Sequence, residues 1–422
     1  MWLAMATIVV PPFVVVPVAL DAFRLPQRMV AEALALASLI ALAIGSRTSD
    51  AVSSEWTPRN ALRLPVLRAA LPLLLVAASS FVTTAHPAHV ADALPDLAIG
   101  IAVLVGWSLG FDAAALRRLL DAALVPAAAL AGMGILQLHH LWQPMVFSES
   151  LAGERLAVTS LAGNPGDLAA MLVLPCLIAQ AGLRDARGWR FWWRLLALAL
   201  CVYALAGTQT LTSLVAAVLG SAALWAVLLP RRLALAGAAT ATAAVVLLVV
   251  LVAPLRSRVE TLVRAATIGG GLNEVLTGRL DAWWVAERLL QEHPLAGVGF
   301  GGYRAEFAAA KLRLMSEGVP FFAGHLNPSF ANAHNEYLEV GADLGWPGLL
   351  AMAWGIALVL RAAWRARRHL SPADRALSWG ALVALALLAL AYFPFRLGPV
   401  AFPALAFLAW LFANEGAEER AP

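Results

Sequence analysis

The sequence is poor in charged residues, and lysine is almost missing. Charged residues make up 13% of the 422 residues, hydrophobic residues make up 61%, and Lys311 is the one lysine among 30 basic residues. A soluble globular chain has about a quarter of its residues charged and about half apolar, so this composition predicts a membrane protein with many spans. The arginines are scattered over short loops instead of forming one basic face, which excludes a nucleic-acid partner.

Cysteine is scarce, and several catalytic motifs are absent. The two cysteines, Cys176 and Cys201, each lie within an apolar run and lack metal-ligand spacing, which indicates apolar packing. The sequence has no HExxH zinc motif and no DxD pair. A zinc-protease site is therefore excluded, and we expect neither a metal ion nor a cofactor.

Apolar runs of spanning length recur along the chain. A transmembrane helix needs about 20 mostly apolar residues. The first run, MWLAMATIVVPPFVVVPVAL, lacks a basic leader and a small-residue cleavage site, so we expect a retained span. The predicted spans are 2–20, 29–45, 67–85, 96–111, 120–138, 166–183, 194–207, 210–229, 233–254, 346–361, 377–394 and 397–413. This pattern predicts an all-α integral membrane protein with about 12 transmembrane helices.

Arginine is distributed unevenly between the two sides of the predicted membrane. With the N-terminus in the cytoplasm, the short inner loops carry seventeen arginines. The short outer loops carry only four, which are Arg24, Arg28, Arg155 and Arg396. Because positive residues are retained on the cytoplasmic side, both termini are predicted in the cytoplasm.

This orientation divides the chain into three parts. Residues 1–254 form an N-terminal transmembrane bundle of about nine spans, and residues 346–422 form C-terminal transmembrane helices with a short cytoplasmic tail. Between them, 255–345 is the one long loop, which the orientation places on the periplasmic side. It is the segment long enough to form a small subdomain outside the membrane.

Within this loop, the stretch LTGRLDAWWVAERLLQEHPLAGVGFGGY predicts a helix from about Arg279 to Glu292, ended by Pro294 and a glycine-rich turn. Arg288 on this helix allows two interpretations. It could form a surface ion pair or a cation–π contact with Trp284, worth about 1 kcal/mol or less. It could also bind an anion, because a guanidinium grips phosphate through two hydrogen bonds. The GVGFGG segment follows a helix instead of a strand, so it predicts a turn and not a dinucleotide site.

The stretch FANAHNEYLEVGADLGWPG is polar and lies immediately before an apolar run. Asn332 is the predicted N-cap of a helix over about 333–344. His334 would share a face of that helix with Gly341 and Gly345, and small residues on a helix face let another helix or a bulky ligand approach. A lone histidine is usually structural, but its ordinary pKa near neutrality also suits a general base.

Other polar residues lie at the outer ends of predicted spans. GERLAVTSLAGNPGDLAA contains Arg155, Asn164 and Asp167, and FPFRLGP contains Arg396. Charges at the membrane edge are costly, so those that face a cavity are functional candidates. Several arginines converging there would form an anion pocket, in which a histidine could act as a general base.

Two stretches together resemble the signature of the O-antigen ligase and polymerase superfamily, HPLAGVGFGGY and NAHNEYLEVGADLGWPGLL. The ligase pattern of this family is His, then Asn, Ser or Gln, then nine residues, Gly, two more residues and Gly. His334, Asn335, Gly345 and Gly348 match that pattern in full. The resemblance is specific over about 279–350.

Two further segments are similar to family motifs but depart from them. SLAGNPGDLAA resembles the G-x-x-N-P-N segment, with Gly166 where the second Asn often stands. TQTLTSLVAAVLG aligns with the T-x-S-R-T segment, but Leu211 occupies the arginine position. The resemblance is therefore looser over 155–215, and a role for that arginine is in doubt in this chain.

The resemblance implies a GT-C-like, metal-independent, inverting glycosyltransferase. Such an enzyme moves O-antigen glycan from undecaprenyl pyrophosphate to the lipid A–core oligosaccharide at the periplasmic face of the bacterial inner membrane. The expected partners are that donor, that acceptor and membrane lipids. His334 is the expected general base, or the residue that positions the acceptor hydroxyl. The residues expected to bind substrate or its pyrophosphate are Arg155, Arg279, Arg288, Arg304, Arg396, Asn335, Glu336 and Asn164.

Three alternatives stay open at this point. A member of the same superfamily could polymerise lipid-linked repeats, or it could transfer the glycan to serine or threonine of a protein. A transporter of lipid-linked glycan is a different class. It would be expected to carry charged residues inside its spans and repeat symmetry between its halves, whereas the predicted spans are almost free of charge.

Overall fold

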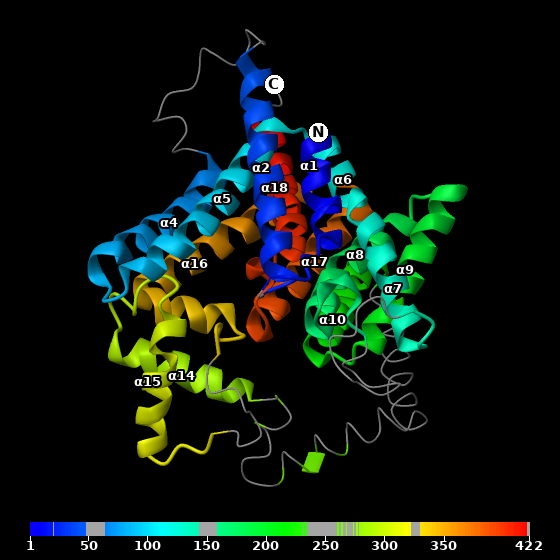
Figure 1. The fold of residues 1–422 in the computed structure, drawn as a ribbon. Helices are drawn as coiled ribbons and strands as arrows, with labels where there is room; N and C mark the ends of the chain where they lie inside the picture. The colour runs from blue at the N-terminus through cyan, green and yellow to red at the C-terminus, as the bar shows by residue number, and fades with distance from the viewer. Residues whose placement is uncertain are drawn as a thin grey trace.

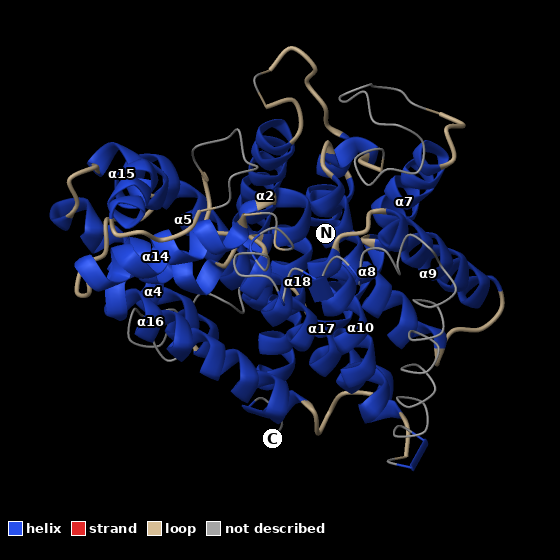
Figure 2. Cartoon of the chain, turned by 90° about the horizontal axis from the view of Figure 1, so that it is seen from below, coloured by secondary structure: helices blue, strands red, loops and turns tan. Residues whose placement is uncertain are grey.

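A computed structural model describes residues 1–19, 21–47, 64–142, 158–230, 278–321 and 330–419, with a few single residues between 232 and 276. These residues form helices joined by loops and contain no β-strand (Figure 2). The predicted all-α class is confirmed for this part of the chain. Most of the predicted span 233–254 lies outside the described residues, and so does Arg155.

The helices follow one another through mostly short connections. The α-helices are α1 (Trp2–Val9), α2 (Arg24–Arg47), α4 (Pro65–Thr83), α5 (Pro87–Gly110), α6 (Ala113–Ala122), α7 (Leu124–Leu138), α8 (Pro165–Leu183), α9 (Trp189–Gly207), α10 (Leu211–Leu228), α14 (Arg279–Glu292), α15 (Tyr303–Ser316), α16 (Glu336–Ala366), α17 (Pro372–Ala391) and α18 (Gly398–Glu419). The short 3-10 helices are η1 (Pro11–Phe13), η3 (Ser160–Ala162) and η4 (Pro394–Arg396). Both termini lie at one end of the helix bundle, and α14 and α15 lie at the other end (Figure 1).

Nine helical stretches of the described residues are long and apolar enough to cross a membrane. They are Arg24–Gly45, Pro65–Thr83, Pro87–Gly110, Ala113–Leu138, Pro165–Leu183, Trp189–Gly207, Leu211–Leu228, Glu336–Ala366 and Pro372–Ala391. Each overlaps one span predicted from the sequence, so the multi-pass character is confirmed. The predicted span 397–413 corresponds to α18, which is not among these nine.

The predicted first span, 2–20, is wrong as a continuous helix. Helix α1 ends at Val9, and Pro11 and Pro12 open the short turn η1. Proline has no N–H for the helical ladder and its ring clashes with the preceding turn, so the helix breaks here. The chain enters α2 at Asp21, whose carboxylate accepts hydrogen bonds from the backbone N–H groups of Phe23 at 3.0 Å and Arg24 at 2.8 Å.

The predicted spans 194–207 and 210–229 are separated by almost no loop, yet they form two helices. The hydroxyl of Thr208 donates to the carbonyl of Leu205 at 2.7 Å, and Gln209 adopts a left-handed backbone with φ of 50°. This tight turn reverses the chain between α9 and α10. Leu211, at the position of the family arginine, is the exposed first residue of α10.

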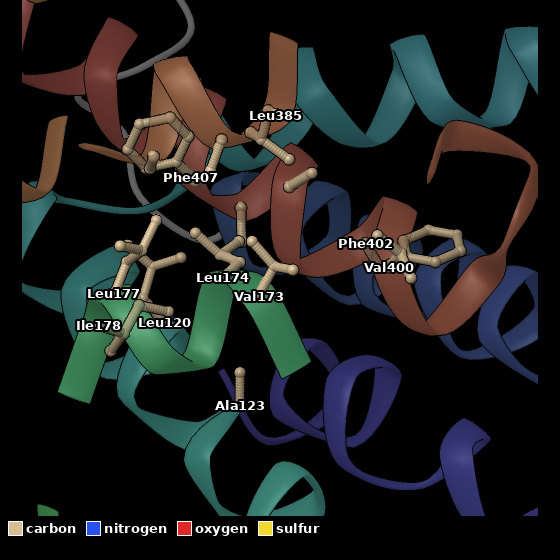
Figure 3. Packing of buried hydrophobic residues seen from close by; sticks show 14 of the residues in the cluster. Leu120, Ala123, Val173, Leu174, Leu177, Ile178, Leu385, Val400, Phe402 and Phe407 are labelled. Atoms are coloured by element: carbon tan, nitrogen blue, oxygen red, sulfur yellow. The ribbon is translucent and has the colours of Figure 1, made fainter. Parts of the chain in front are cut away.

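Helix α8 lies at the centre of the bundle, and nearly all of its residues are buried. It packs against α9, α10 and α17, and Figure 3 shows Leu174, Leu177 and Ile178 of this helix in a cluster with Phe407 of α18. Small residues bring other helices together, since a Cβ atom at Gly220 of α10 would lie 2.9 Å from the carbonyl oxygen of Gly380 in α17. Close van der Waals packing of this kind drives helix association inside a membrane.

Helices α14 and α15 form a smaller unit with its own apolar core. Val285, Leu289, Tyr303 and Phe307 are buried together between the two helices and the start of α16. The unit lies beside α4, α5 and α16, away from α7 to α10 (Figures 1 and 2). It contains the described part of the predicted loop subdomain, and it holds the beginning of α16 in place.

Candidate functional site

The helix that follows the histidine segment begins later than the sequence predicts. Asn335, and not Asn332, is the N-cap, because its side-chain oxygen accepts a hydrogen bond from the backbone N–H of Leu338 at 3.1 Å. Helix α16 therefore starts at Glu336. The predicted substrate residue Asn335 is 5% exposed and has a structural role in this cap.

His334 lies in the turn before α16, so the predicted helical face shared by His334 and the glycines is wrong. Its backbone is left-handed, with φ of 53°. A non-glycine residue in this region is uncommon and is held there by its surroundings. His334 as a residue is only partly buried, whereas its Nδ1 atom is inaccessible to solvent.

The glycines of this segment serve a close backbone contact instead. Gly345 has φ of 64° and kinks α16, and a Cβ atom there would lie 2.5 Å from the carbonyl oxygen of Pro294. The kink exposes the Ala342 carbonyl, which accepts from the N–H of Val298 at 2.9 Å. The N–H of Trp346 donates to Pro294 at 2.8 Å. The predicted turn GVGFGG is thus docked onto the kink by backbone hydrogen bonds.

Asp343 secures the same turn through its side chain. Its carboxylate oxygens accept from the backbone N–H groups of Gly301 at 2.8 Å and Tyr303 at 2.9 Å, at the beginning of α15. A carboxylate at the start of a helix satisfies N–H groups that have no helical partner. This contact links the orientation of α15 and α14 to that of α16.

Aromatic rings surround His334. The centre of its ring lies 4.9 Å from that of Phe393, 5.7 Å from that of Phe330 and 6.0 Å from that of Tyr392. Tyr392 and Phe393 are stacked on each other with their centres 4.4 Å apart. They follow the end of α17, so the rings around the imidazole come from two segments of the chain, the end of α17 and the stretch that contains His334 itself.

A buried carboxylate, Asp167, lies behind these rings. Arg24 donates to it from Nε at 2.6 Å and from Nη2 at 3.0 Å, and the hydroxyl of Tyr392 donates to it as well. Burial raises the pKa of Tyr392 well above its usual value, and the charge of Asp167 raises it further, against the positive charges of Arg24 and Arg279. The phenol therefore stays protonated and acts as a donor to the carboxylate.

Local geometry explains why Arg24 and Asp167 meet. Asn164, a predicted substrate residue, is the N-cap of α8 and accepts from the N–H of Gly166 at 2.7 Å. A Cβ atom at Gly166 would lie only 3.0 Å from the hydroxyl oxygen of Tyr392. The glycine that replaces the second Asn of the family segment thus makes room for Tyr392 to reach Asp167.

Glu339 joins the turn of His334 to η4. Its Oε1 accepts from Arg396 Nη2 at 2.9 Å and from Asn332 Nδ2 at 3.1 Å, and its Oε2 accepts from the backbone N–H of Ala333 at 2.8 Å. Glu339 is 4% exposed. Because the two residues before His334 are both bound to this carboxylate, Glu339 fixes the turn that presents the imidazole.

Glu336 and Arg396, both predicted substrate residues, hold the same region together. Glu336 Oε1 accepts from the backbone N–H of Phe395 at 2.9 Å. Burial lowers the pKa of Arg396, but Glu339 and Asp343 raise it more, so the net shift is upward and the guanidinium stays charged. Both side chains bind the protein itself and also line the cavity described below.

The remaining predicted arginines are placed differently from one another. Arg279 is the first residue of α14, and its charge acts on Tyr392 at the His334 site. Arg288 donates to Glu292 at 2.9 Å and also pairs with Glu317 at the end of α15, which is the ion-pair interpretation. Arg304 is paired with Asp92 and donates to His89 at 3.3 Å, both on α5.

A cavity of about 600 Å³ lies between α2, α4, α5, α16, α17 and α18. Its walls are mostly apolar and include Leu97, Ile101 and Leu382. Charged residues also line it, among them Glu336 and Arg396. Because Glu336 and Arg396 also hold η4 beside His334, the cavity adjoins the site.

Four residues of the site were not among the predicted site residues: Arg24, Tyr392, Phe393 and Glu339. Asp167 was noted only as a polar residue at the top of a span. The sequence offers one signal for Arg24, which is one of only four arginines in the short outer loops. The aromatic pair gives no such signal, because rings at the end of an apolar helix are common in membrane proteins.

The geometry describes a partly open histidine among aromatic rings, with cationic side chains nearby and an apolar cavity beside it. This arrangement places a histidine, cationic side chains and an apolar cavity together at one end of the helix bundle. The family model described as O-antigen ligase matches residues 196–353. This match supports a relation of the segment to the O-antigen ligase/polymerase superfamily, whose members are glycosyl-transfer enzymes. No curated protein gives a match.

The matched segment contains part of the site. It includes Arg279, His334 and Glu339, whereas Arg24 and Asp167 lie outside it. The family resemblance found in the motifs is confirmed, and it supports ligase- or polymerase-type activity in general. The residues that complete the site come from parts of the chain that the family model does not cover.

Proposed function

We propose that this protein transfers O-antigen glycan from undecaprenyl pyrophosphate to the lipid A–core oligosaccharide. One observation carries the proposal: His334 is partly exposed, fixed by its turn and next to Tyr392, on which the positive charge of Arg279 acts, and an apolar cavity adjoins the site. The family match supports the reaction class. The choice of lipid A–core as acceptor rests on the ligase pattern that His334, Asn335, Gly345 and Gly348 complete.

The proposed reaction is a direct displacement. The acceptor hydroxyl oxygen attacks the anomeric carbon of the donor sugar, and its proton passes to His334. The bond between that carbon and the pyrophosphate oxygen breaks, so undecaprenyl pyrophosphate leaves and the configuration inverts. Arg279 stabilises the negative charge that develops on the leaving group. The general base and the group that stabilises the leaving pyrophosphate are both side chains of the protein, so the proposed displacement needs no metal ion.

The cavity suits the lipid portion of a substrate. An isoprenoid or acyl chain gains by contact with apolar walls, and the pyrophosphate or sugar would remain at the charged residues. We assign the donor lipid to this cavity. The glycine-bearing part of α16, where small residues were expected to let another helix or a bulky ligand approach, is already covered by the docked turn at Gly297.

The positions of arginine residues in short loops support an orientation of the site relative to the membrane. Helix α8 begins at Pro165, with Asp167 in its first turn near the His334 site, and it ends at Leu183. Arg184 and Arg187 lie in the connection to α9, and Arg190 lies in the first turn of α9. Positive residues in short loops mark the cytoplasmic side. We therefore assign His334 to the periplasmic side of the inner membrane and both termini to the cytoplasm.

The test is His334→Ala in cells that have no other source of the activity, with lipopolysaccharide and lipid-linked glycan resolved by gel. We expect transfer to fall about 100-fold or more, the range for loss of a general base. Long glycan should remain on undecaprenyl pyrophosphate and the core should be bare. His293→Ala is the matched control, because this exposed histidine lies at the C-cap of α14.

Other outcomes identify other functions. Core carrying a single repeat would identify a polymerase. Normal lipopolysaccharide with loss of glycan from proteins would identify a protein glycosyltransferase. Unchanged products in the variant, at a membrane level equal to that of the unmodified protein, would exclude a catalytic role of His334.

A further inference from the structure

We propose that Arg24, at the beginning of α2 and outside the matched domain, binds the pyrophosphate group of the lipid-linked donor at the His334 site. The identity of the substrate rests on the proposed function. The position of the anion site does not, because it follows from contacts around Asp167. Arg24 lies outside the segment that the family model matches, and no motif of the sequence marks it as a ligand residue.

The guanidinium of Arg24 is held in one orientation. Nε and Nη2 donate to the two oxygens of Asp167, at 2.6 Å and 3.0 Å. A guanidinium bound in this way is planar and rigid, so it loses little further side-chain entropy when it binds an anion. Nη1 takes no part in the pair and has no partner in the described ranges, so it can donate to a ligand.

The two partners differ sharply in exposure. The side chain of Arg24 is 43% exposed, whereas that of Asp167 is 1% exposed. A pair that served only packing would be expected to bury both members or to expose both. Here the carboxylate is fixed inside the protein by Arg24 and by the Tyr392 hydroxyl. The arginine it holds remains open to solvent.

Arg24 and His334 lie against the same aromatic ring. The guanidinium carbon of Arg24 lies 5.2 Å from the centre of Phe393, and the ring centre of His334 lies 4.9 Å from that centre. The two groups are thus separated by no more than the sum of these distances. In the donor, the pyrophosphate is bonded directly to the anomeric carbon, so an anion-binding group must lie close to the general base.

The local charges favour an anion at this place. Asp167 is compensated by Arg24, and Asp21 is occupied with the backbone N–H groups of Phe23 and Arg24. The positive charges of Arg24 and Arg279 both act on Tyr392. The charge of Asp167 is thus compensated at this place, and a second cation lies near enough to act on the same tyrosine, which favours an anionic group such as pyrophosphate.

This assignment gives Arg24 and Asp167 different roles. Arg24 contacts the substrate, and Asp167 is a positioning residue that acts through Arg24 and Tyr392. Lysine at position 24 would keep the charge and could pair with Asp167. It could not donate to both carboxylate oxygens and also present a third nitrogen in a fixed direction.

The experiment measures binding of undecaprenyl pyrophosphate to the purified full-length protein by native mass spectrometry, with inorganic pyrophosphate and phosphatidylglycerol as separate probes. The variants are Arg24→Ala and Arg24→Lys. Arg313→Ala is the matched control, because its side chain is also 43% exposed and pairs with a carboxylate, Glu292, at 2.7 Å. Turnover with donor and acceptor lipids is measured in parallel.

We expect Arg24→Ala to weaken binding of both pyrophosphate probes by about 10- to 100-fold, the effect of losing a hydrogen bond to a charged group. Arg24→Lys should lie between this variant and the unmodified protein. Arg313→Ala should bind as the unmodified protein does, and binding of phosphatidylglycerol should not change in any variant.

The opposite results overturn the inference. Unchanged pyrophosphate binding in both Arg24 variants excludes the contact, and so does a lack of binding by the unmodified protein. An equal loss for phosphatidylglycerol makes the site one for any anionic lipid. If Arg24→Ala does not fold, judged by its thermal midpoint, Arg24→Lys decides. If pyrophosphate binding depends on Arg24 but no glycan reaches lipid A–core, the proposed function fails and this site stands.

Discussion

Two arginines of this protein are equally exposed, yet their surroundings differ. Arg24 in the helix bundle and Arg313 in the α14–α15 unit each have a side chain that is 43% exposed and paired with a carboxylate. The partner of Arg24, Asp167, is 1% exposed, whereas the partner of Arg313, Glu292, is 28% exposed. The exposed fraction of an arginine side chain therefore does not indicate how much its ion pair contributes to stability.

The difference lies in the solvation of the carboxylate. A buried charge has lost its water and depends on every donor that replaces it, so removing one partner is costly. An exposed pair competes with water and is screened by salt, and it contributes between zero and about 1 kcal/mol. The surroundings of Asp167 in the bundle are thus a buried polar cluster, whereas the surroundings of Glu292 on α14 are a solvated surface.

The largest expected effect is that of Asp167→Ala. The change leaves the Arg24 guanidinium without its carboxylate and the buried Tyr392 hydroxyl without its acceptor. We expect the free energy of unfolding to fall by about 3–5 kcal/mol. Glu292→Ala, the equivalent change in the α14–α15 unit, should cost about 1 kcal/mol or less. Thermal unfolding in the same detergent measures both, and equal losses would remove the distinction between the two regions.

A smaller effect is expected where the two regions join, at the kink of α16. Gly345→Ala places a side chain on a backbone with φ of 64° and a Cβ atom 2.5 Å from the Pro294 carbonyl oxygen. We expect a loss of about 2–4 kcal/mol, from the left-handed conformation and from displacement of the docked turn.

The control for this change is Gly132→Ala in α7, where no atom lies within 4 Å of the added Cβ and the backbone is helical. This variant should be as stable as the unmodified protein, or more stable by up to about 1 kcal/mol. The same unfolding measurement serves both variants. A stable Gly345→Ala protein with full transfer activity would show that the kink is not needed to hold α16.

The smallest effect is expected for Arg288→Ala. Arg288 pairs with Glu292 and Glu317 on the α14–α15 surface, and its loss should change the free energy of unfolding by about 1 kcal/mol or less. Transfer activity should stay within a few-fold of that of the unmodified protein. If kcat/KM instead falls 100-fold while stability is kept, Arg288 binds the substrate and the anion-binding interpretation is correct.

Much of the fold could be predicted from the sequence. Nine predicted spans coincide with helices. A helix formed by a long apolar run satisfies all of its backbone hydrogen bonds internally, so such a run predicts a span whatever it packs against. The first span, by contrast, was predicted as one continuous helix in spite of Pro11 and Pro12. The apolar composition of this run is that of a span, but each proline lacks the backbone donor that a continuous helix needs.

The candidate site could be predicted only in part. The histidine motif identified His334, since its residues lie close together in the chain. The expected helix start at Asn332 was wrong because two polar residues compete as caps, and Asn332 is bound to Glu339 instead. The bond between Asn332 and Glu339 is part of the contacts that join the turn to η4. No local sequence pattern predicts these contacts.

The sequence by itself determined the membrane class, nine of the spans, the arginine asymmetry and the motif around His334, all of which depend on residue types or on neighbours in the chain. The tertiary structure alone decided that Arg24 meets Asp167, which is 143 residues away. It also decided that Tyr392 approaches both of them through the space that Gly166 leaves open. Such a meeting depends on how helices pack, and that packing is set by the shapes of many side chains together, which no single stretch of sequence encodes.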